Sequence, residues 1–475
     1  MKRIFISLCL FFIVLIAKSQ YQVILQTPNY KSGFAYLTYY SGKNINVEDS
    51  ALVNNKGVAI FKKDKKLQPG IYYIVFPGKN KLVDFLVNKE QNITIKADTS
   101  DLINKTTITG SKENVLFQEY QTFIAVKGKQ LQVAQQAYSS SKNKTDSLLH
   151  ERSYKRLNKE LNQFRENIIK QYPQSMLATL FKSIMEPEVP NTFPVTKQDT
   201  ITNYNFYKKH YWDNISFGNE IIIRTPFFVP KVERYFRDIL VQSADTIIKE
   251  ADYLLLLART NSEMYKFLLN WLTDEYLYPK YMGQDAVFVH LFEKYHSKGV
   301  SNWLNAKQLS TISNRAYMVM SNLIGEKAAN LDMVDSTGKP SPLYNVNAEY
   351  VVICFWDPTC GHCREEVPRL DSLYRAKWKQ LGVKIYGVLS ENEKEKWLHF
   401  IKENKLSEWI HVYQTEETKK AISDSKLPGY KQLYDIIQTP TLYLLDKEKR
   451  IIAKKLTPLQ MDDLLKAKLK NKTAN

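Results

Sequence analysis

Two cysteines separated by two residues are the strongest chemical signal in this sequence, in the stretch Cys360-Gly361-His362-Cys363. An apolar run, residues 350–356, precedes the pair, and apolar residues at helical spacing follow it. This order predicts a strand, a tight loop and a helix, with both thiols at the helix N-terminus. The helix dipole and the free N–H groups there favour a thiolate, which is the form that attacks disulfides. We therefore expect a dithiol that exchanges disulfides.

Two further side chains near the dithiol are candidates for a catalytic role. An imidazole at His362, charged or hydrogen-bonding, would stabilise the Cys360 thiolate and favour the reduced pair; the alternative is a histidine that only caps a helix. Glu366 follows Cys363 by three residues and so shares its helical face. A carboxylate partly desolvated beside a thiol can carry its proton; the alternative is an ordinary acid that complements the helix dipole.

Length and composition indicate a folded protein of several domains. The chain has 475 residues, too many for one ordinary core. Hydrophobic residues make up 44% and charged residues 24%, as in globular proteins. The net charge of +18 is spread along the chain among acidic residues, so we expect solvated surfaces and no nucleic-acid partner. The sequence has no phosphate-binding loop, and its seven histidines form no zinc pattern, so we expect neither a cofactor nor a metal.

The first nineteen residues have the features of a secretory signal peptide. Lys2 and Arg3 precede an apolar run over residues 4–16, and Ala17-Lys18-Ser19 fits the cleavage rule of small residues. We predict a signal peptide over 1–19 and export to the periplasm; an uncleaved anchor is the alternative. Only four cysteines are present, too few for a disulfide framework in an exported protein.

Turn signals and hydrophobic periodicity divide the rest of the chain into three parts. We predict a small antiparallel β-sandwich-like or barrel domain over 20–110, a helical domain over 111–322 and an α/β domain over 323–475. The fold class is therefore multidomain α+β. The strands predicted in the first part are 21–25, 34–40, 58–61, 71–76, 82–87 and 93–96.

In the last part, strands alternate with helices around a largely parallel core. After a β-hairpin over 329–343 come strand 350–356, helix 361–379, strand 383–389, helix 393–404 and strands near 411–413, 441–445 and 451–453. A last helix begins at Thr457-Pro458, a good N-cap followed by a proline at the first helical position.

The C-terminal motifs resemble the thioredoxin superfamily, and in particular its TlpA/ResA-type branch of exported thiol–disulfide oxidoreductases. The similarity covers about residues 325 to 470, roughly a third of the chain. The multidomain layout also resembles exported proteins of Gram-negative bacteria. The motifs are Val352-Ile353-Cys354-Phe355-Trp356, Cys360-Gly361-His362-Cys363, Pro368 and Thr439-Pro440-Thr441, in that order.

The resemblance implies a role for each matching residue. Cys360 would be the exposed nucleophile and the more buried Cys363 would resolve the mixed disulfide. Glu366 would handle protons. Pro440 would be cis, so that Thr439 offers strand-like hydrogen bonds to a substrate.

Trp356 would belong to the same substrate-binding set as Thr439 and Pro440. Cys354 departs from the family pattern because thioredoxins usually place a buried acid at this position. We expect Cys354 to be a buried, apolar thiol.

The function that we expect is reduction or isomerisation of disulfides in cysteine-containing envelope proteins. Reduction would need electrons from a membrane thiol donor, and the direction of electron flow stays open. A homodimer is a candidate assembly. Two alternatives remain: a thiol peroxidase, which needs a threonine two residues before its cysteine, where this chain has Pro358, and a binding or assembly protein with an accessory redox domain.

Overall fold

The computed structural model describes residues 20–141, 143–191, 193–391 and 393–473. The predicted signal peptide, 1–19, lies outside the described residues. The chain divides into two compact units, one formed by residues 20–240 and 257–267 and the other by residues 241–256 and 268–475. We call these the N-terminal unit and the C-terminal unit. None of the described helices is long and apolar enough to cross a membrane.

The N-terminal unit begins with two four-stranded sheets that share one apolar core. Their strand orders are β4-β1-β7-β8 and β3-β2-β5-β6. Val23 and Leu25 from the first sheet and Leu37 and Ile74 from the second are all fully buried in that core. This confirms the sandwich-like prediction, although β1 and β7 are parallel. The strands are β1 Tyr21–Gln26, β2 Phe34–Ser41, β3 Asn44–Leu52, β4 Val58–Lys63, β5 Gly70–Val75, β6 Leu82–Val87, β7 Asn92–Ala97 and β8 Thr106–Thr109.

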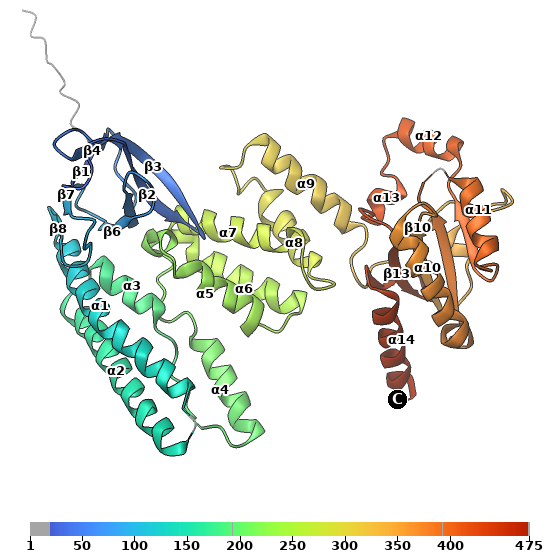
Figure 1. Ribbon diagram of the computed structural model, residues 1–475. Coiled ribbons are helices and arrows are strands. Elements are labelled where there is room, and N and C mark those ends of the chain that lie inside the picture. Colours follow the sequence, from blue (N-terminus) through green and yellow to red (C-terminus); the bar gives the residue numbers. More distant parts are fainter. Residues whose placement is uncertain (1–19, 142, 192, 392, 474–475) are drawn as a thin grey trace, which may run out of the picture. The chain divides into compact units, whose positions relative to one another are not determined.

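A helical region follows, and its first two helices form a long hairpin (Figure 1). Ser111 and Asn143 cap these helices through side-chain oxygens, and Phe123 stacks on Phe164 between them. The α-helices are α1 Lys112–Ser139, α2 Lys144–Gln171, α3 Met176–Ile184, α4 Lys197–His210, α5 Phe228–Arg234, α6 Ala244–Leu257, α7 Ser262–Leu277, α8 Asp285–Leu291 and α9 Ala306–Met320. Shorter or wider turns are η1 Glu220–Arg224, η2 Tyr235–Ile239, η3 Ala258–Thr260 and η4 Phe292–His296.

The C-terminal unit contains a six-stranded sheet of order β14-β13-β10-β11-β12-β9. Strands β10, β11 and β12 are parallel, and β13, β14 and β9 run antiparallel to their neighbours. The predicted parallel core is therefore limited to three strands. The strands are β9 Val334–Asp335, β10 Tyr350–Trp356, β11 Val383–Leu389, β12 Ile410–Tyr413, β13 Thr441–Asp446 and β14 Ile451–Lys454.

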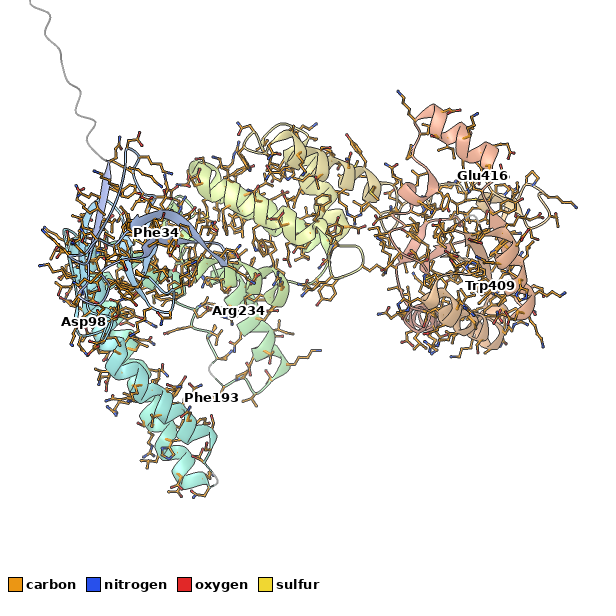
Figure 2. The ribbon with its side chains drawn as sticks, turned by 45° about the horizontal axis from the view of Figure 1, so that its top comes forward. Phe34, Asp98, Phe193, Arg234, Trp409 and Glu416 are labelled. Atoms are coloured by element: carbon orange, nitrogen blue, oxygen red, sulfur yellow. The ribbon has the colours of Figure 1, made fainter. Side chains whose placement is uncertain are left out.

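Apolar side chains cover both faces of this sheet, since every residue of β10 is buried. Val352 and Cys354 point into one core cluster, Val351 and Ile353 into the other. In Figure 2, Trp409 lies among packed side chains, while Glu416 begins α12 at the surface. The helices are η5 Leu343–Asn345, α10 Gly361–Leu373, η6 Tyr374–Trp378, η7 Lys379–Leu381, α11 Lys394–Glu403, α12 Glu416–Ser425, α13 Tyr430–Leu433 and α14 Pro458–Thr473.

Two sequence-based expectations for this unit need correction. The hairpin predicted over 329–343 is reduced to β9 and an isolated bridge between Val334 and Pro340 around the 336–339 turn. The helix predicted over 361–379 is regular only to Leu373, after which η6 and η7 continue it with other geometry. The start of α14 is as predicted, because the Thr457 hydroxyl accepts from the Gln460 N–H.

Candidate active site

The dithiol lies at the end of the central strand β10, beyond a tight turn organised by Asp357. One Asp357 carboxylate oxygen accepts hydrogen bonds from the backbone N–H and from the hydroxyl of Thr359, both at 2.8 Å. The Asp357 carbonyl accepts from the Cys360 N–H at 3.2 Å. These bonds hold the turn between Asp357 and Cys360 in one conformation. Because the turn directly follows β10, the sheet fixes the position of Cys360.

Cys360 is the N-cap residue of α10, with extended backbone angles of φ −75° and ψ 123°. No side chain caps this helix, so the positive end of its dipole acts directly on the Cys360 sulfur. The side chain is partly exposed. The space beside Gly361 is open, since no atom other than those of adjacent residues and the helix backbone lies within 4 Å of the point where a side chain at this residue would begin. An approaching disulfide can therefore reach this sulfur.

The surroundings of Cys360 favour its thiolate. Partial burial opposes ionisation, but hydrogen bonds from the backbone N–H of Cys363 and from the Thr439 side chain outweigh it and lower the pKa of the Cys360 thiol below its usual value. The Cys363 thiol and the backbone of His362 act in the same direction. Cys360 therefore has the properties of an attacking sulfur.

Cys363 lies one turn further along α10 and has the opposite properties. Its side chain is fully buried, and burial raises the pKa of Cys363 to about 12. The Asp357 N–H donates to its sulfur at 3.4 Å. The two thiols are close enough to hydrogen-bond with each other and are not joined in a disulfide. One accessible and one protected sulfur are the pair that a two-step exchange needs.

A second segment, which leads into the neighbouring strand β13, completes the site. The Thr439–Pro440 peptide bond is cis, as the resemblance implied. The Thr439 carbonyl accepts from the Cys360 thiol at 3.3 Å, and the Thr439 side chain hydrogen-bonds to both sulfurs. A pocket of about 630 Å³ lies beside this segment, and residues 437–442 form one of its walls.

His362 and Glu366 both line this pocket, on the helix side. Glu366 is about one-quarter exposed, and one of its oxygens pairs with Arg369 at 2.6 Å. The structure thus places six of the seven predicted residues at the dithiol or its pocket, namely Cys360, His362, Cys363, Glu366, Thr439 and Pro440.

Trp356 is the exception among the predicted site residues. Its side chain has no exposed surface and packs on Phe400 inside the core. Direct substrate contact by Trp356 does not fit this burial, because the residue belongs to the core cluster on one face of the sheet. Cys354 is likewise fully buried, as expected, and burial raises the pKa of its thiol.

Sequence reasoning missed Asp357, which is buried and holds the turn in place. The sequence Asp357-Pro358-Thr359 could have indicated this role. An aspartate at the start of such a segment is typical of a turn in which its side chain accepts a hydrogen bond from the backbone N–H two residues further on. In the described parts of the chain, no group of three or more His, Cys, Asp or Glu side chains is arranged to hold a metal ion.

A β-strand, a turn with two cysteines and a helix, facing a cis-proline that directly precedes an antiparallel strand, define a thioredoxin-like domain. A family model agrees: residues 324–454 match the AhpC/TSA family. Residues 125–322 and 21–117 match two domains of unknown function, DUF5106 and DUF4369.

Known proteins with similar sequences carry names of the same class. The thiol-disulfide oxidoreductase ResA of Bacillus thuringiensis subsp. konkukian is 27% identical over 146 residues, which are 30% of this chain and 77% of the relative. ResA of Halalkalibacterium halodurans is 34% identical over 71 residues, 15% of this chain and 39% of the relative.

Solved structures give the same range of names. A domain of a possible thiol-disulfide isomerase from Cytophaga hutchinsonii is 35% identical and covers 32% of this chain and 97% of its own, with a TM-score of 0.27. A thioredoxin-like protein from Bacteroides caccae is 24% identical, covers 60% of this chain and 98% of its own, and has a TM-score of 0.43. The C-terminal part of the chain belongs to the thioredoxin-like thiol–disulfide oxidoreductases.

Proposed function

We propose that this chain is an exported thiol–disulfide oxidoreductase that reduces or isomerises disulfides in envelope proteins through Cys360 and Cys363. One observation carries the proposal. Cys360 is partly exposed at the start of α10, whereas Cys363, one turn further on, is fully buried, and these environments shift the pKa of the two thiols in opposite directions. A structural disulfide would need no such difference, whereas a nucleophile and its resolving thiol do.

In the first step, the Cys360 thiolate attacks one sulfur of a substrate disulfide. A bond forms between Cys360 and that sulfur, the substrate S–S bond breaks, and its electron pair leaves on the second substrate sulfur, which takes a proton from solvent. The amides at the start of α10 and the Thr439 side chain stabilise the attacking thiolate. The product is a mixed disulfide.

In the second step, Cys363 loses its proton and attacks the Cys360 sulfur. The mixed disulfide breaks, the second substrate thiol is released, and the enzyme is left with a Cys360–Cys363 disulfide. The substrate has gained two electrons and two protons. Because burial keeps Cys363 protonated at neutral pH, a base must remove its proton, and Glu366 in the adjoining pocket is our candidate.

The substrate would bind along the segment that carries Thr439 and Pro440. This segment borders the pocket and faces Cys360, so an extended peptide would pair with its backbone as an added strand. His362 lines the same pocket and would interact with the substrate and with the Cys360 thiolate.

The direction of electron flow follows from the reduction potential of the dithiol. A reductase needs a thiol donor that returns the Cys360–Cys363 disulfide to the dithiol, and a membrane thiol protein is the partner that we propose. An isomerase needs none, since the substrate's own thiol resolves the mixed disulfide. A potential near or below roughly −250 mV supports the reductase, and one near roughly −150 mV an oxidase or isomerase.

Insulin reduction with dithiothreitol as donor tests the activity. We expect the wild-type chain to accelerate precipitation of the insulin B chain, and Cys360→Ser to abolish the acceleration. Cys354→Ala, which changes a fully buried thiol, is the matched control and should stay active. Activity that survives in Cys360→Ser would refute the proposal and favour the binding or assembly alternative.

The peroxidase alternative has a weaker basis in this site. Thr359 directly precedes Cys360, and its hydroxyl already donates to the Asp357 carboxylate at 2.8 Å. It is therefore engaged away from the sulfur. We expect the wild-type chain to consume peroxide, with a thiol donor present, no faster than Cys360→Ser does. A much faster rate in the wild type would support the peroxidase instead.

Export and residence in the periplasm are proposed from the N-terminal sequence, with Lys2, Arg3 and an apolar run before a small-residue cleavage site. Mass spectrometry of the mature protein from a cell-envelope fraction tests this. A mature N-terminus near Gln20 is expected, and an intact Met1 in the cytoplasm would contradict it.

A further inference from the structure

A buried ion-pair cluster connects α9 to the segment that carries the cis-proline. Arg315 of α9 donates from Nη1 to the Asp435 carboxylate at 2.5 Å, and Lys455 pairs with the other oxygen of the same carboxylate. The Arg315 side chain is 9% exposed and that of Asp435 only 1%. A carboxylate buried to this degree needs both partners, because an unpaired buried charge is strongly unfavourable.

A second buried cluster lies beside the first. The Lys454 ammonium donates to the Asp285 carboxylate of α8 and, at 2.6 Å each, to the backbone carbonyl and side-chain oxygen of Asn322. Its three N–H groups thus have three acceptors. Asn322, which is fully buried, also donates from Nδ2 to the Leu433 carbonyl at 2.9 Å.

The two clusters hold the base of one active-site wall. Arg315 contacts Asp435, and Asn322 contacts Leu433. Asp435 immediately precedes residues 436–440, and this short segment contains Thr439, whose carbonyl contacts Cys360. Asp435 and Lys455 themselves line the pocket beside the dithiol. Arg315 of α9 and Asn322, two residues after α9, thus hold one end of this segment, and Thr439 lies near its other end.

The family models place a boundary within this arrangement. The DUF5106 match ends at 322 and the AhpC/TSA match starts at 324, which would separate Arg315 and Asn322 from the redox domain. The compact unit instead includes residues 268–475. By its internal contacts, the C-terminal unit thus includes α8 and α9 together with the dithiol.

We propose that Arg315 and Asn322 are positioning residues of the redox site, and that α8 and α9 are a working part of it rather than the end of a separate domain. Arg315 and Asn322 act through Asp435 and Leu433 on the segment that holds Thr439 against Cys360. Loosening that segment withdraws the Thr439 side chain from the sulfurs, so the Cys360 thiolate loses one of its stabilising partners. It also disturbs the edge along which a substrate would pair.

The test compares full-length variants by the pH profile of Cys360 alkylation with iodoacetamide and by insulin reduction. For Arg315→Met we expect the alkylation midpoint to rise by about half a pH unit, which is roughly a threefold loss of thiolate at neutral pH. We also expect KM for insulin to rise more than kcat falls. Arg315→Lys, which can still pair with one Asp435 oxygen, should restore most of both values, and Asn322→Ala should shift them in the same direction as Arg315→Met.

Asp252→Asn is the matched control. Asp252 accepts from His290, Lys294 and Tyr295 within the helical part of the same unit, so its loss should reduce stability without moving the alkylation midpoint. A wild-type midpoint and KM in Arg315→Met, or an equal shift in Asp252→Asn, would overturn the proposal.

Arg315→Met can be judged only if it folds, so a second variant is needed in case it does not. If Arg315→Met does not fold, Asn322→Ala decides, and a wild-type alkylation midpoint and KM in Asn322→Ala refute the proposal. This result is distinct from failure of the proposed function, because alkylation of Cys360 reports on the sulfur whether or not insulin is reduced.

Discussion

The backbone N–H of Asp357 points at the sulfur of Cys363, 3.4 Å away. Asp357 is the first residue after the central strand, and Cys363 is the buried half of the dithiol, so the sheet itself supplies a hydrogen bond to the resolving sulfur. This bond lowers the pKa of Cys363, but burial is the larger effect and leaves the pKa raised. The resolving thiol is thus protonated at neutral pH.

Removing the Thr439 hydroxyl should weaken the nucleophile. Thr439→Val keeps the side-chain shape but loses the hydrogen bond that lowers the pKa of the Cys360 thiol. We expect that pKa to rise and alkylation at pH 7 to slow by about threefold. Thr439→Ser retains a hydroxyl and should behave like the wild type. The pH dependence of the alkylation rate measures the effect, and an identical midpoint in Thr439→Val would contradict it.

Removing the resolving thiol should trap the reaction halfway. In Cys363→Ala the Cys360 thiolate can still attack, but no protein thiol is in place to break the mixed disulfide. We expect a covalent adduct between the variant and a disulfide-containing peptide, visible as a mass increase that dithiothreitol reverses. Cys354→Ala should not accumulate this adduct. Equal adduct in both variants would mean that Cys363 is not the resolving thiol.

Asp357 should contribute to both stability and activity. Asp357→Ala removes the acceptor of two Thr359 hydrogen bonds in a buried turn, and we expect a loss of about 1–3 kcal/mol in unfolding free energy. The position of Cys360 should also become less defined, with slower insulin reduction. Asp357→Asn keeps one carbonyl acceptor and serves as the comparison in urea unfolding. Wild-type stability in Asp357→Ala would show that the turn holds without it.

Acid should destabilise the C-terminal unit through His411. Burial lowers the pKa of His411 to about 4, although its hydrogen bond with the Leu406 carbonyl opposes this. An unfolded histidine titrates near 6.5, so the unfolded chain takes up the proton first. The stabilising contribution is therefore complete above about pH 6.5 and is lost as the pH falls toward 4, by up to about 3 kcal/mol.

Replacement of His411 by phenylalanine tests this contribution. His411→Phe cannot titrate, so its unfolding free energy should depend less on pH between 6.5 and 4 than that of the wild type. His296, whose pKa burial also lowers to about 4, remains in both proteins and causes the same acid loss in each. Urea unfolding at a series of pH values measures the difference. Parallel curves for the two proteins would rule out the assigned role of His411.

Local sequence patterns were sufficient for the elements that surround the dithiol. The apolar run over 350–356 predicts β10 at its observed bounds, because a strand buried on both faces needs apolar residues throughout. Strand β3, in contrast, was not predicted. Its sequence is largely polar and its side chains are mostly exposed, so no alternation marked it; pairing with β2 alone defines it.

Contacts between distant residues could not be predicted from sequence. Arg315 and Asp435 are 120 residues apart, and neither stands in a recognisable motif, so only the folded unit shows that they meet. Trp356 illustrates the opposite problem. Its place beside the dithiol could be predicted from sequence, but the strand pattern did not show whether its side chain would face the pocket or the core, and the Trp356 side chain is fully buried.

The buried thiol of Cys354 makes the central strand open to direct measurement. Its side chain has no exposed surface, and burial keeps it protonated, so a thiol reagent can modify it only when β10 separates from its neighbours. Once Cys360 and Cys363 are blocked, the rate of this slow modification gives the free energy of opening at the middle of the sheet. Cys354 is thus a natural probe of the local stability of the sheet that positions the reactive sulfur.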